Sequence, residues 1–245
     1  MPSVRSSLVL CAAAIACGPA FAAGGTAPAS SAWKGSAQLG GVATTGNSRT
    51  SSVDGHFRLG YASGPWTSNL HLEVLHASAA GSTTADRVYG ELHTRHELGS
   101  NSYLFGVLRA THDPFSGYRY QASVAAGLGR MLLHSRDMEL RAEIGPGYRE
   151  AQIEGGPTQR DAIVRVHGVF TYRFTSKAHF DQALTAIAGS ENTELQSVTS
   201  LTTDITGALA LKLSYTVLHN TTVALGRSGT DTFTSVNLVY SFQSL

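Results

Sequence analysis

Histidines and carboxylates stand two positions apart at several places in this chain of 245 residues. His71 and Glu73 form one such pair, Glu91 and His93 form another, and His167 has a similar polar setting. In an extended strand, side chains two positions apart point to the same face. A carboxylate can then orient an imidazole for nucleophilic catalysis, or both groups can bind a metal ion. Either chemistry needs a further group, a nucleophile or another ligand, which the fold would have to bring close.

The motifs that commonly supply such a group, G-x-S-x-G and H-E-x-x-H, do not occur in the sequence. Histidine and glutamate at alternate positions also arise freely on polar strand faces. We therefore expect no catalytic residue, no metal site and no bound cofactor, and we interpret these histidines as structural.

The elements that would position these side chains are strands with two unlike faces. From 138 to 149, charged or very small residues alternate strictly with apolar ones, in the sequence MELRAEIGPGYR. Alternation with a period of two indicates a strand with one polar and one apolar face. The same pattern recurs along the chain, interrupted by turn signals. It predicts twelve strands, at about 35–44, 51–61, 66–77, 87–98, 103–112, 118–133, 138–149, 162–174, 179–188, 195–206, 209–220 and 232–242.

The two faces of these strands differ in a way that favours a membrane barrel over a soluble sandwich. One face is apolar, and Tyr, Phe or Trp stands near several strand ends, as in an interfacial girdle. In hydrocarbon every backbone polar group must be paired, so a spanning sheet has to close on itself. We therefore predict an all-β fold, a closed antiparallel transmembrane β-barrel. The opposite face carries the candidate lumen-lining charges, which are Arg58, Glu73, Glu91, Arg95, Arg109, Arg119, Glu139, Arg141, Glu143, Arg149, Arg165, Arg173 and Lys212.

Two details of this prediction remain open at the level of the sequence. The strand at 103–112 has two possible phases, and we choose the one with Leu104 and Leu108 on the apolar face. Its end and the next strand bring Asp113 and Arg119 near a Gly-containing turn, which makes them a candidate loop site or a simple Asp-initiated turn. Alternate connections are short, which predicts that both chain ends lie in the periplasm. The loops on the other side, such as the segment 150–160, are expected to be long.

The N-terminus carries an export signal. Arg5 precedes an apolar run, and Ala20-Phe21-Ala22 forms an A-x-A cleavage signal, so we expect a secretory signal peptide at 1–22 with cleavage after Ala22. A short periplasmic leader at 23–34 and the barrel at 35–245 would follow. A lipoprotein interpretation would use Cys17, although no Leu stands three residues before it. Charged residues make up only 14% of the chain and the net charge is +1, which gives no support for a nucleic-acid partner.

Five segments in the same order carry a resemblance to a known family: WKGSAQLGGVATTGNS, YLFGVLRATHDPFSGYRYQASVAAGLGR, EIGPGYR, ENTELQSVTSLTTDI and TDTFTSVNLVYSF. Over about Trp33–Phe242 the chain resembles the bacterial salt-induced outer-membrane proteins, domain of unknown function 481. The resemblance implies an outer-membrane β-barrel and no agreed activity. In contrast to most such barrels, the chain continues past its last aromatic residue, with Gln243-Ser244-Leu245 after Phe242.

Three functions are compatible with this sequence. The first is a structural or envelope-stress barrel of the bacterial outer membrane, with a largely ion-paired lumen; near-balance of lumen charges favours it. The second is a narrow channel for small polar solutes or ions. The third is a lipid-modifying enzyme of the outer membrane. The expected partners are outer-membrane lipids and, through the last strand, the barrel assembly machinery.

Overall fold

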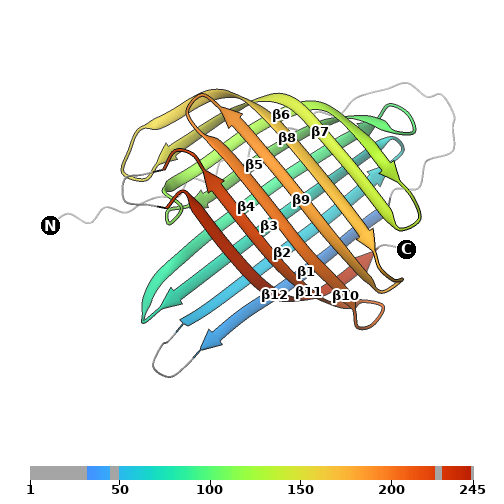
Figure 1. The fold of residues 1–245 in the computed structure, drawn as a ribbon, viewed down its shortest axis with the longest axis horizontal. Helices are drawn as coiled ribbons and strands as arrows, with labels where there is room; N and C mark the ends of the chain where they lie inside the picture. Colours follow the sequence, from blue (N-terminus) through green and yellow to red (C-terminus); the bar gives the residue numbers. More distant parts are fainter. Residues whose placement is uncertain (1–31, 45–49, 224–227, 244–245) are drawn as a thin grey trace.

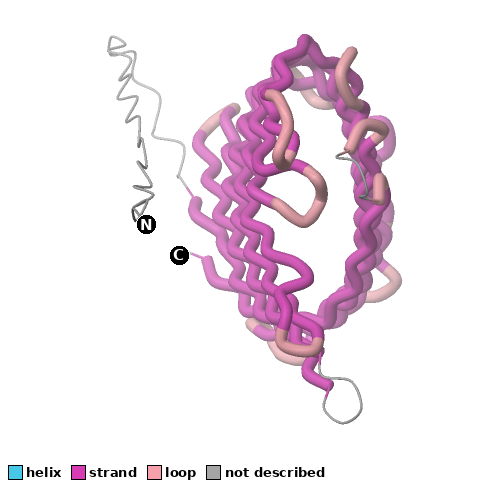
Figure 2. Tube along the Cα trace, turned by 90° about the vertical axis from the view of Figure 1, so that its left-hand side faces the viewer, coloured by secondary structure: helices cyan, strands magenta, loops and turns pink. Residues whose placement is uncertain are grey.

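In the part of the chain that the structure describes, twelve antiparallel strands close into a single barrel in which each strand pairs with its neighbours in the sequence and β1 pairs with β12. The computed structural model describes residues 32–44, 50–223 and 228–243. The strands are β1 (Ala32–Thr44), β2 (Thr50–Ser63), β3 (Trp66–Ala79), β4 (Ser82–Glu97), β5 (Ser102–Asp113), β6 (Tyr118–His134), β7 (Met138–Ile153), β8 (Thr158–Arg173), β9 (Ala178–Gly189), β10 (Thr193–Asp204), β11 (Leu209–Asn220) and β12 (Thr230–Gln243). Figure 1 shows them running obliquely around the barrel, and Figure 2 shows that its cross-section is elongated.

The predicted all-β fold and its strand count are confirmed. The first strand begins at Ala32, three residues before the expected start of the barrel. The expected signal peptide, its cleavage after Ala22 and the alternative at Cys17 lie outside the described residues. Within the described part of the chain, no helix is long and apolar enough to cross a membrane.

Alternation dictates which side chains face outwards. Large apolar residues such as Leu72, Leu128 and Ile144 are between 44% and 58% exposed on the outer surface, an unusual fraction for a soluble domain. The residues between them face the lumen and are mostly buried or half-buried. On β5, Leu104 and Leu108 are exposed, while Tyr103, Phe105 and Val107 are each only 4% exposed and form a buried cluster with Ala125. The chosen phase of this strand agrees with the structure.

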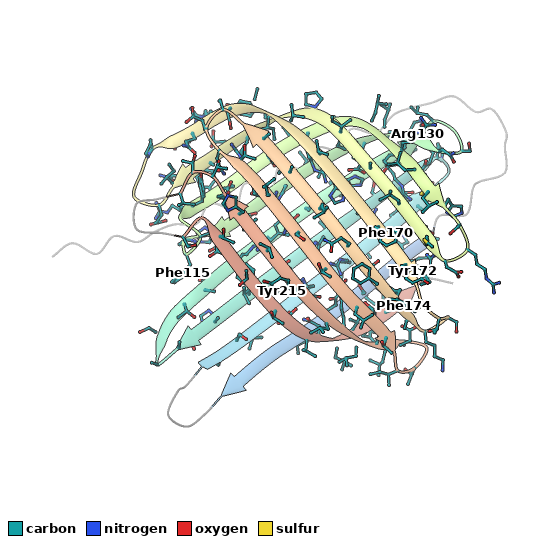
Figure 3. The ribbon with its side chains drawn as sticks, viewed as in Figure 1. Phe115, Arg130, Phe170, Tyr172, Phe174 and Tyr215 are labelled. Atoms are coloured by element: carbon teal, nitrogen blue, oxygen red, sulfur yellow. The ribbon has the colours of Figure 1, made fainter. Side chains whose placement is uncertain are left out.

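The outer apolar surface is bounded at both ends of the barrel. We name the end where β1 begins and β12 finishes the terminal end, and the opposite end the loop end. Aromatic side chains lie at the terminal end. The ring centroids of Trp33 and Tyr61 are 4.5 Å apart, and those of Tyr172 and Phe174 are 4.8 Å apart. Figure 3 labels Tyr172 and Phe174, together with Phe170, along this part of the barrel.

An ion pair on the outer surface limits the apolar surface at the loop end. Arg160 Nε lies 2.7 Å from a carboxylate oxygen of Glu150, and Tyr120 donates a hydrogen bond to the same carboxylate at 2.8 Å. On β7 the outward apolar side chains therefore run from Met138 to Tyr148. Ten residue steps of about 3.3 Å on a strand tilted by about 40° give roughly 25 Å, the height of the apolar band of a transmembrane barrel.

The connections at the loop end are shorter than expected. The segment from Ser78 to Ala85 forms most of a β-hairpin, whose turn consists of Ala80 and Gly81, both with positive φ. Positive φ at two central residues matches the right-handed twist of the flanking strands. The segment 150–160 likewise contains only a short connection between Ile153 and Thr158. The expectation of long loops was therefore wrong at these two connections, because the strands continue beyond the apolar band.

Small residues allow β6 and β7 to approach closely. A Cβ atom placed on Gly145 would overlap the carbonyl of Ala126 on β6, and one placed on Gly127 would overlap the carbonyl of Ile144. These lumen-facing glycines explain why tiny residues share the polar face of β7 with Arg and Glu.

Candidate functional site

The lumen is the candidate functional site because most predicted charges converge there. Twelve of the thirteen candidate charges lie on strand positions that point inwards; the residue that does not is Arg119. Arg95, Glu139, Arg141 and Arg173 lie at the terminal end, where Glu139 pairs with both Arg141 (3.0 Å) and Arg173 (3.2 Å). The others lie deeper, and their contacts divide the lumen into a packed side and a more open side.

Arg119 and Asp113 do not form the expected pair. A register shift between Tyr118 and Tyr120 turns Tyr118 inwards, where it is 1% exposed, and leaves Arg119 exposed on the outside. Asp113 instead accepts hydrogen bonds from the backbone N–H groups of Phe115 (3.1 Å) and Ser116 (3.0 Å). The prediction of Arg119 as a lumen charge was wrong because one extra residue in a strand reverses its faces. The Asp-initiated turn accounts for Asp113.

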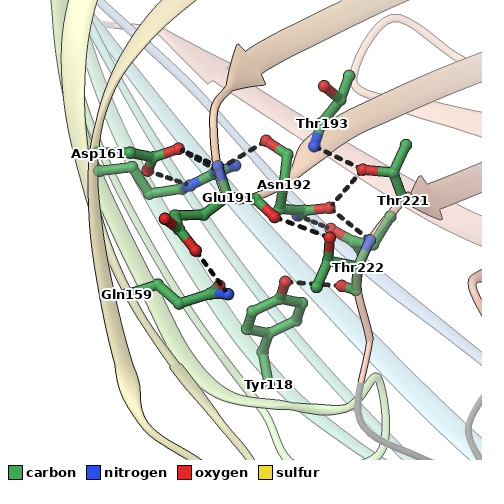
Figure 4. A network of polar contacts seen from close by, with 10 residues as sticks. Tyr118, Gln159, Asp161, Glu191, Asn192, Thr193, Thr221 and Thr222 are labelled. Carbon is green, nitrogen blue, oxygen red and sulfur yellow. Dashed lines mark hydrogen bonds and ion pairs between the residues drawn. The ribbon is translucent and has the colours of Figure 1, made fainter.

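A hydrogen-bonded network fills the packed side at the loop end (Figure 4). Arg149 Nη2 lies 2.9 Å from Asp161 Oδ2 and donates to the carbonyl of Asn192 at 2.7 Å, and both charged side chains are at most 3% exposed. The Asn192 side chain contacts Asn220 at 2.7 Å, and Tyr118 donates to the carbonyl of Thr222 at 2.6 Å. The network therefore joins β6, β7, β8 and the turns after β9 and β11.

Glu143 is the centre of a second network, deeper in the lumen. Its carboxylate lies 2.7 Å from Arg165 Nη1, 2.9 Å from His93 Nε2 and 3.2 Å from the Tyr103 hydroxyl. Its side chain is 5% exposed. His93 comes from β4 and Glu143 from β7, so this contact crosses the lumen rather than linking neighbouring strands. Three partners of compatible polarity explain how a carboxylate is accommodated away from water.

Arg109 on β5 and Glu194 on β10 form another contact across the lumen, with Nη2 2.6 Å from the carboxylate. Their side chains are 8% and 5% exposed. The Arg109 guanidinium also lies 5.3 Å from the ring centroid of Tyr89. Both contacts therefore join strands that are not neighbours in the barrel, and Arg109–Glu194 joins strands from nearly opposite parts of it.

In the described part of the barrel, two cavities lie in the lumen beside these networks, one after the other along the barrel. The cavity nearer the terminal end has a volume of about 310 Å³ and is lined by residues that include Arg95, Tyr103 and Arg141. The cavity nearer the loop end has a volume of about 390 Å³ and reaches Ser52 and Ala77. Four side chains line both cavities and therefore lie between them: Arg58, His71, Glu91 and His167. We name these four residues the lumen junction.

Three lumen groups on β2 and β3 form a cluster that shares His71 with this junction. The ligand atoms of His56, His71 and Glu73 all lie within 4.8 Å of one another. His56 Nε2 lies 3.2 Å from Asp54, and the Asp54 carboxylate accepts a hydrogen bond from Asn237 on β12. His56 was absent from the predicted site residues. Its hairpin partner across the β2–β3 turn is Glu73, and that register could have identified it.

The chain is similar to known proteins in sequence and in fold. The family model described as "Protein of unknown function, DUF481" matches residues 37–242. The uncharacterized protein YdiY of Escherichia coli (strain K12) is 26% identical over 221 residues, covering 88% of this chain and 85% of YdiY. Among solved structures, the NanC porin superposes with a TM-score of 0.51 at 13% identity, covering 86% of this chain and 98% of the porin. An outer membrane channel (COG4313) from Pseudomonas putida F1 gives a TM-score of 0.50 at 10% identity, covering 90% and 97%.

Proposed function

The chain belongs to the DUF481 family, and we propose that it is an outer-membrane barrel that provides a narrow pathway for small polar solutes or ions. The location is supported by the outer apolar band with its aromatic and charged borders, and by the fold that the chain shares with a porin and an outer membrane channel. Insertion would proceed through the barrel assembly machinery, with β12 as its recognition element. Outer-membrane lipids would then surround the apolar band.

The observation that carries the proposal is the pair of lumen cavities that are lined by charged side chains and have only the lumen junction between them. Together they extend from residues near the terminal end to residues near the loop end. A barrel of twelve strands is narrower than the porins of 16–18 strands that contain wide aqueous channels. Passage would therefore be restricted to small solutes.

The lumen junction would determine which solutes pass. It combines one guanidinium, one carboxylate and two imidazoles, so neither sign of charge dominates. Arg58 has the longest of these side chains, and its removal should widen the narrowest point. Glu91 is the acidic group of the junction, and its neutralisation should favour anions.

Planar-bilayer conductance of the mature chain tests this function, with heat-dependent gel migration confirming a folded barrel. We expect defined current steps, larger steps for Arg58→Ala and a shift of selectivity towards anions for Glu91→Gln. Arg160→Gln, on the outer surface, is the matched control and should conduct as the unaltered chain does. Folded protein that gives no current steps in either the unaltered form or Arg58→Ala would disprove the pathway.

The second candidate is the structural or envelope-stress barrel predicted from the sequence. The contacts Arg109–Glu194 and His93–Glu143 favour it, because side chains that join non-neighbouring strands through the lumen obstruct it. A folded barrel that gives no current steps in the same experiment would support this candidate.

The lipid-modifying alternative gains little from the geometry. The contact between His167 Nδ1 and the Thr185 hydroxyl, at 2.9 Å, brings an imidazole and a potential nucleophile together. Both residues line the 390 Å³ cavity inside the barrel. A lipid substrate would approach from the outer surface, so this contact is in the wrong place for that chemistry.

A further inference from the structure

We propose that the lumen binds one divalent transition-metal cation, with Zn²⁺ as the best fit, between His56, His71 and Glu73. Two imidazoles and one carboxylate form a ligand set that Zn²⁺ accepts, with a fourth position left for water or a solute. The sequence favoured a structural role for the lumen histidines. The hairpin β2–β3 changes that view because it brings three ligands into one cluster.

Unpaired ring nitrogens are the first observation that points to a ligand. His71 Nε2 is buried and has no hydrogen-bond partner among the residues that the structure describes. His56 Nδ1 is also buried without a hydrogen bond, although it lies 3.4 Å from a Glu73 oxygen. Buried polar atoms in folded proteins are almost always hydrogen-bonded, so two ring nitrogens without a hydrogen bond in one cluster need an explanation. A metal ion between them would satisfy both.

The second observation is the group behind His56. Asp54 lies 3.2 Å from His56 Nε2, so that nitrogen donates to a carboxylate while Nδ1 points towards Glu73. A carboxylate that holds the second nitrogen of an imidazole fixes its tautomer and leaves the other nitrogen free to bind a metal. Asn237 on β12 holds Asp54 in turn. The arrangement is therefore built from three strands, β2, β3 and β12.

The distances require only side-chain adjustment. In a tetrahedral Zn²⁺ site with bonds of about 2.1 Å, ligand atoms lie about 3.4 Å apart. His56 Nδ1 and Glu73 Oε2 already have a separation of 3.4 Å, and all the ligand atoms lie within 4.8 Å of one another. Rotation of the side chains can close the remaining distance. The cluster lines the 390 Å³ cavity, so an ion and its water can enter.

The charge around the cluster selects the kind of cation. Asp54, Glu73 and Glu91 line this cavity, and so do the cationic residues Arg58, Arg87 and Lys212. Because these charges balance, the electrostatic field gives a dication little attraction. Binding must therefore come from coordination by imidazole nitrogen, which favours Zn²⁺ over Mg²⁺ and Ca²⁺.

Calorimetric titration with Zn²⁺ of the mature, tag-free barrel in detergent tests the proposal, and so does the visible spectrum with Co²⁺. We expect one Zn²⁺ per chain, no competition from a large excess of Mg²⁺, and a tetrahedral Co²⁺ spectrum. His71→Ala and His56→Ala should abolish binding. Asp54→Asn should weaken it by about 10–100-fold, the usual effect of removing an orienting carboxylate. His76→Ala is the matched control, since His76 lies on the same strand as His71 but is exposed on the outer surface.

Each result decides the proposal independently of conductance. Failure of the folded, unaltered barrel to bind Zn²⁺ would overturn it, and so would binding that persists in both His71→Ala and His56→Ala. If one of these variants does not fold, the Co²⁺ spectrum of the unaltered protein still decides, because a spectrum typical of six oxygen ligands excludes this site.

Discussion

Replacing Arg149 by Met should destabilise the barrel by about 3–5 kcal/mol, the usual effect of removing one partner from a buried ion pair. Arg149 makes two short charge-assisted contacts, to Asp161 at 2.9 Å and to the carbonyl of Asn192 at 2.7 Å. Hydrogen bonds to charged groups contribute about 1.5–3 kcal/mol each, which gives a consistent total. After the change, Asp161 would retain the backbone N–H of Glu191, at 3.2 Å, as a partner. That single contact should place the loss towards the lower end of the range.

The assay is reversible urea unfolding of the barrel in lipid vesicles, followed by tryptophan fluorescence. The double variant Arg149→Met/Asp161→Leu is the informative comparison, because it removes both charges and should recover a large part of the loss. A single variant that costs less than about 1 kcal/mol would refute the claim that this pair is buried and essential. The variant Asp161→Leu alone gives the loss of unfolding free energy caused by removing that carboxylate. If the double variant loses this full amount in addition to the loss of Arg149→Met, the two side chains act independently.

Three further substitutions test the outer apolar band, the close approach of β6 and β7, and the network around Glu143. Ile144→Arg, at the middle of the apolar band, should lower the free energy of unfolding in lipid by about 2–4 kcal/mol. Gln152→Arg, beyond the charged border, should change it little, and urea titration measures both. Gly145→Val should prevent closure of the barrel and abolish heat-dependent gel migration, while Gly168→Ala, where an added Cβ meets only ordinary contacts, should fold normally. Glu143→Gln should lower the unfolding free energy by about 3 kcal/mol, because it leaves a buried guanidinium without its counter-charge.

Strand number and strand phase could be predicted from the sequence because both depend on local alternation. The ambiguous case was β5, because the two sets of side chains that could face the membrane are both apolar. One set contains Leu104 and Leu108, and the other contains Tyr103 and Phe105. The structure resolves it by packing: the aromatic side chains fill the lumen beside Ala125, while the leucines contact the membrane side. A preference for aliphatic residues in the middle of the lipid face gives the same answer.

The region around Tyr118 could not be predicted in the same way. A strand that contains one extra residue keeps a normal composition, so alternation counted from Val124 places Tyr118 outside and Arg119 inside. The structure reverses both, because the register shift turns Tyr118 towards the carbonyl of Thr222. That partner lies 104 residues away, and no local signal identifies it. At the loop end the strands extend further than the sequence predicted. Polar residues continue a strand after it has left the apolar band, so composition does not mark where the strand ends.

Contacts inside the lumen fall into two kinds, and only one kind is accessible to sequence reasoning. In a two-stranded hairpin, the turn sets the register, so the short turn after Ser63 places His56 opposite Glu73 and Arg58 opposite His71. The cluster proposed to bind Zn²⁺ could therefore be deduced from a single turn. Arg109 and Glu194 are different, since their meeting depends on closure of the whole barrel and on its flattened cross-section. A test follows from this distinction: a substitution that prevents β1–β12 pairing should abolish the Arg109–Glu194 contact, whereas a peptide hairpin of β2 and β3 should retain the His56–Glu73 register in membrane-mimicking micelles. Nuclear Overhauser contacts between opposite residues in that peptide would confirm the local origin of the cluster, and a shifted register would show that the barrel imposes it.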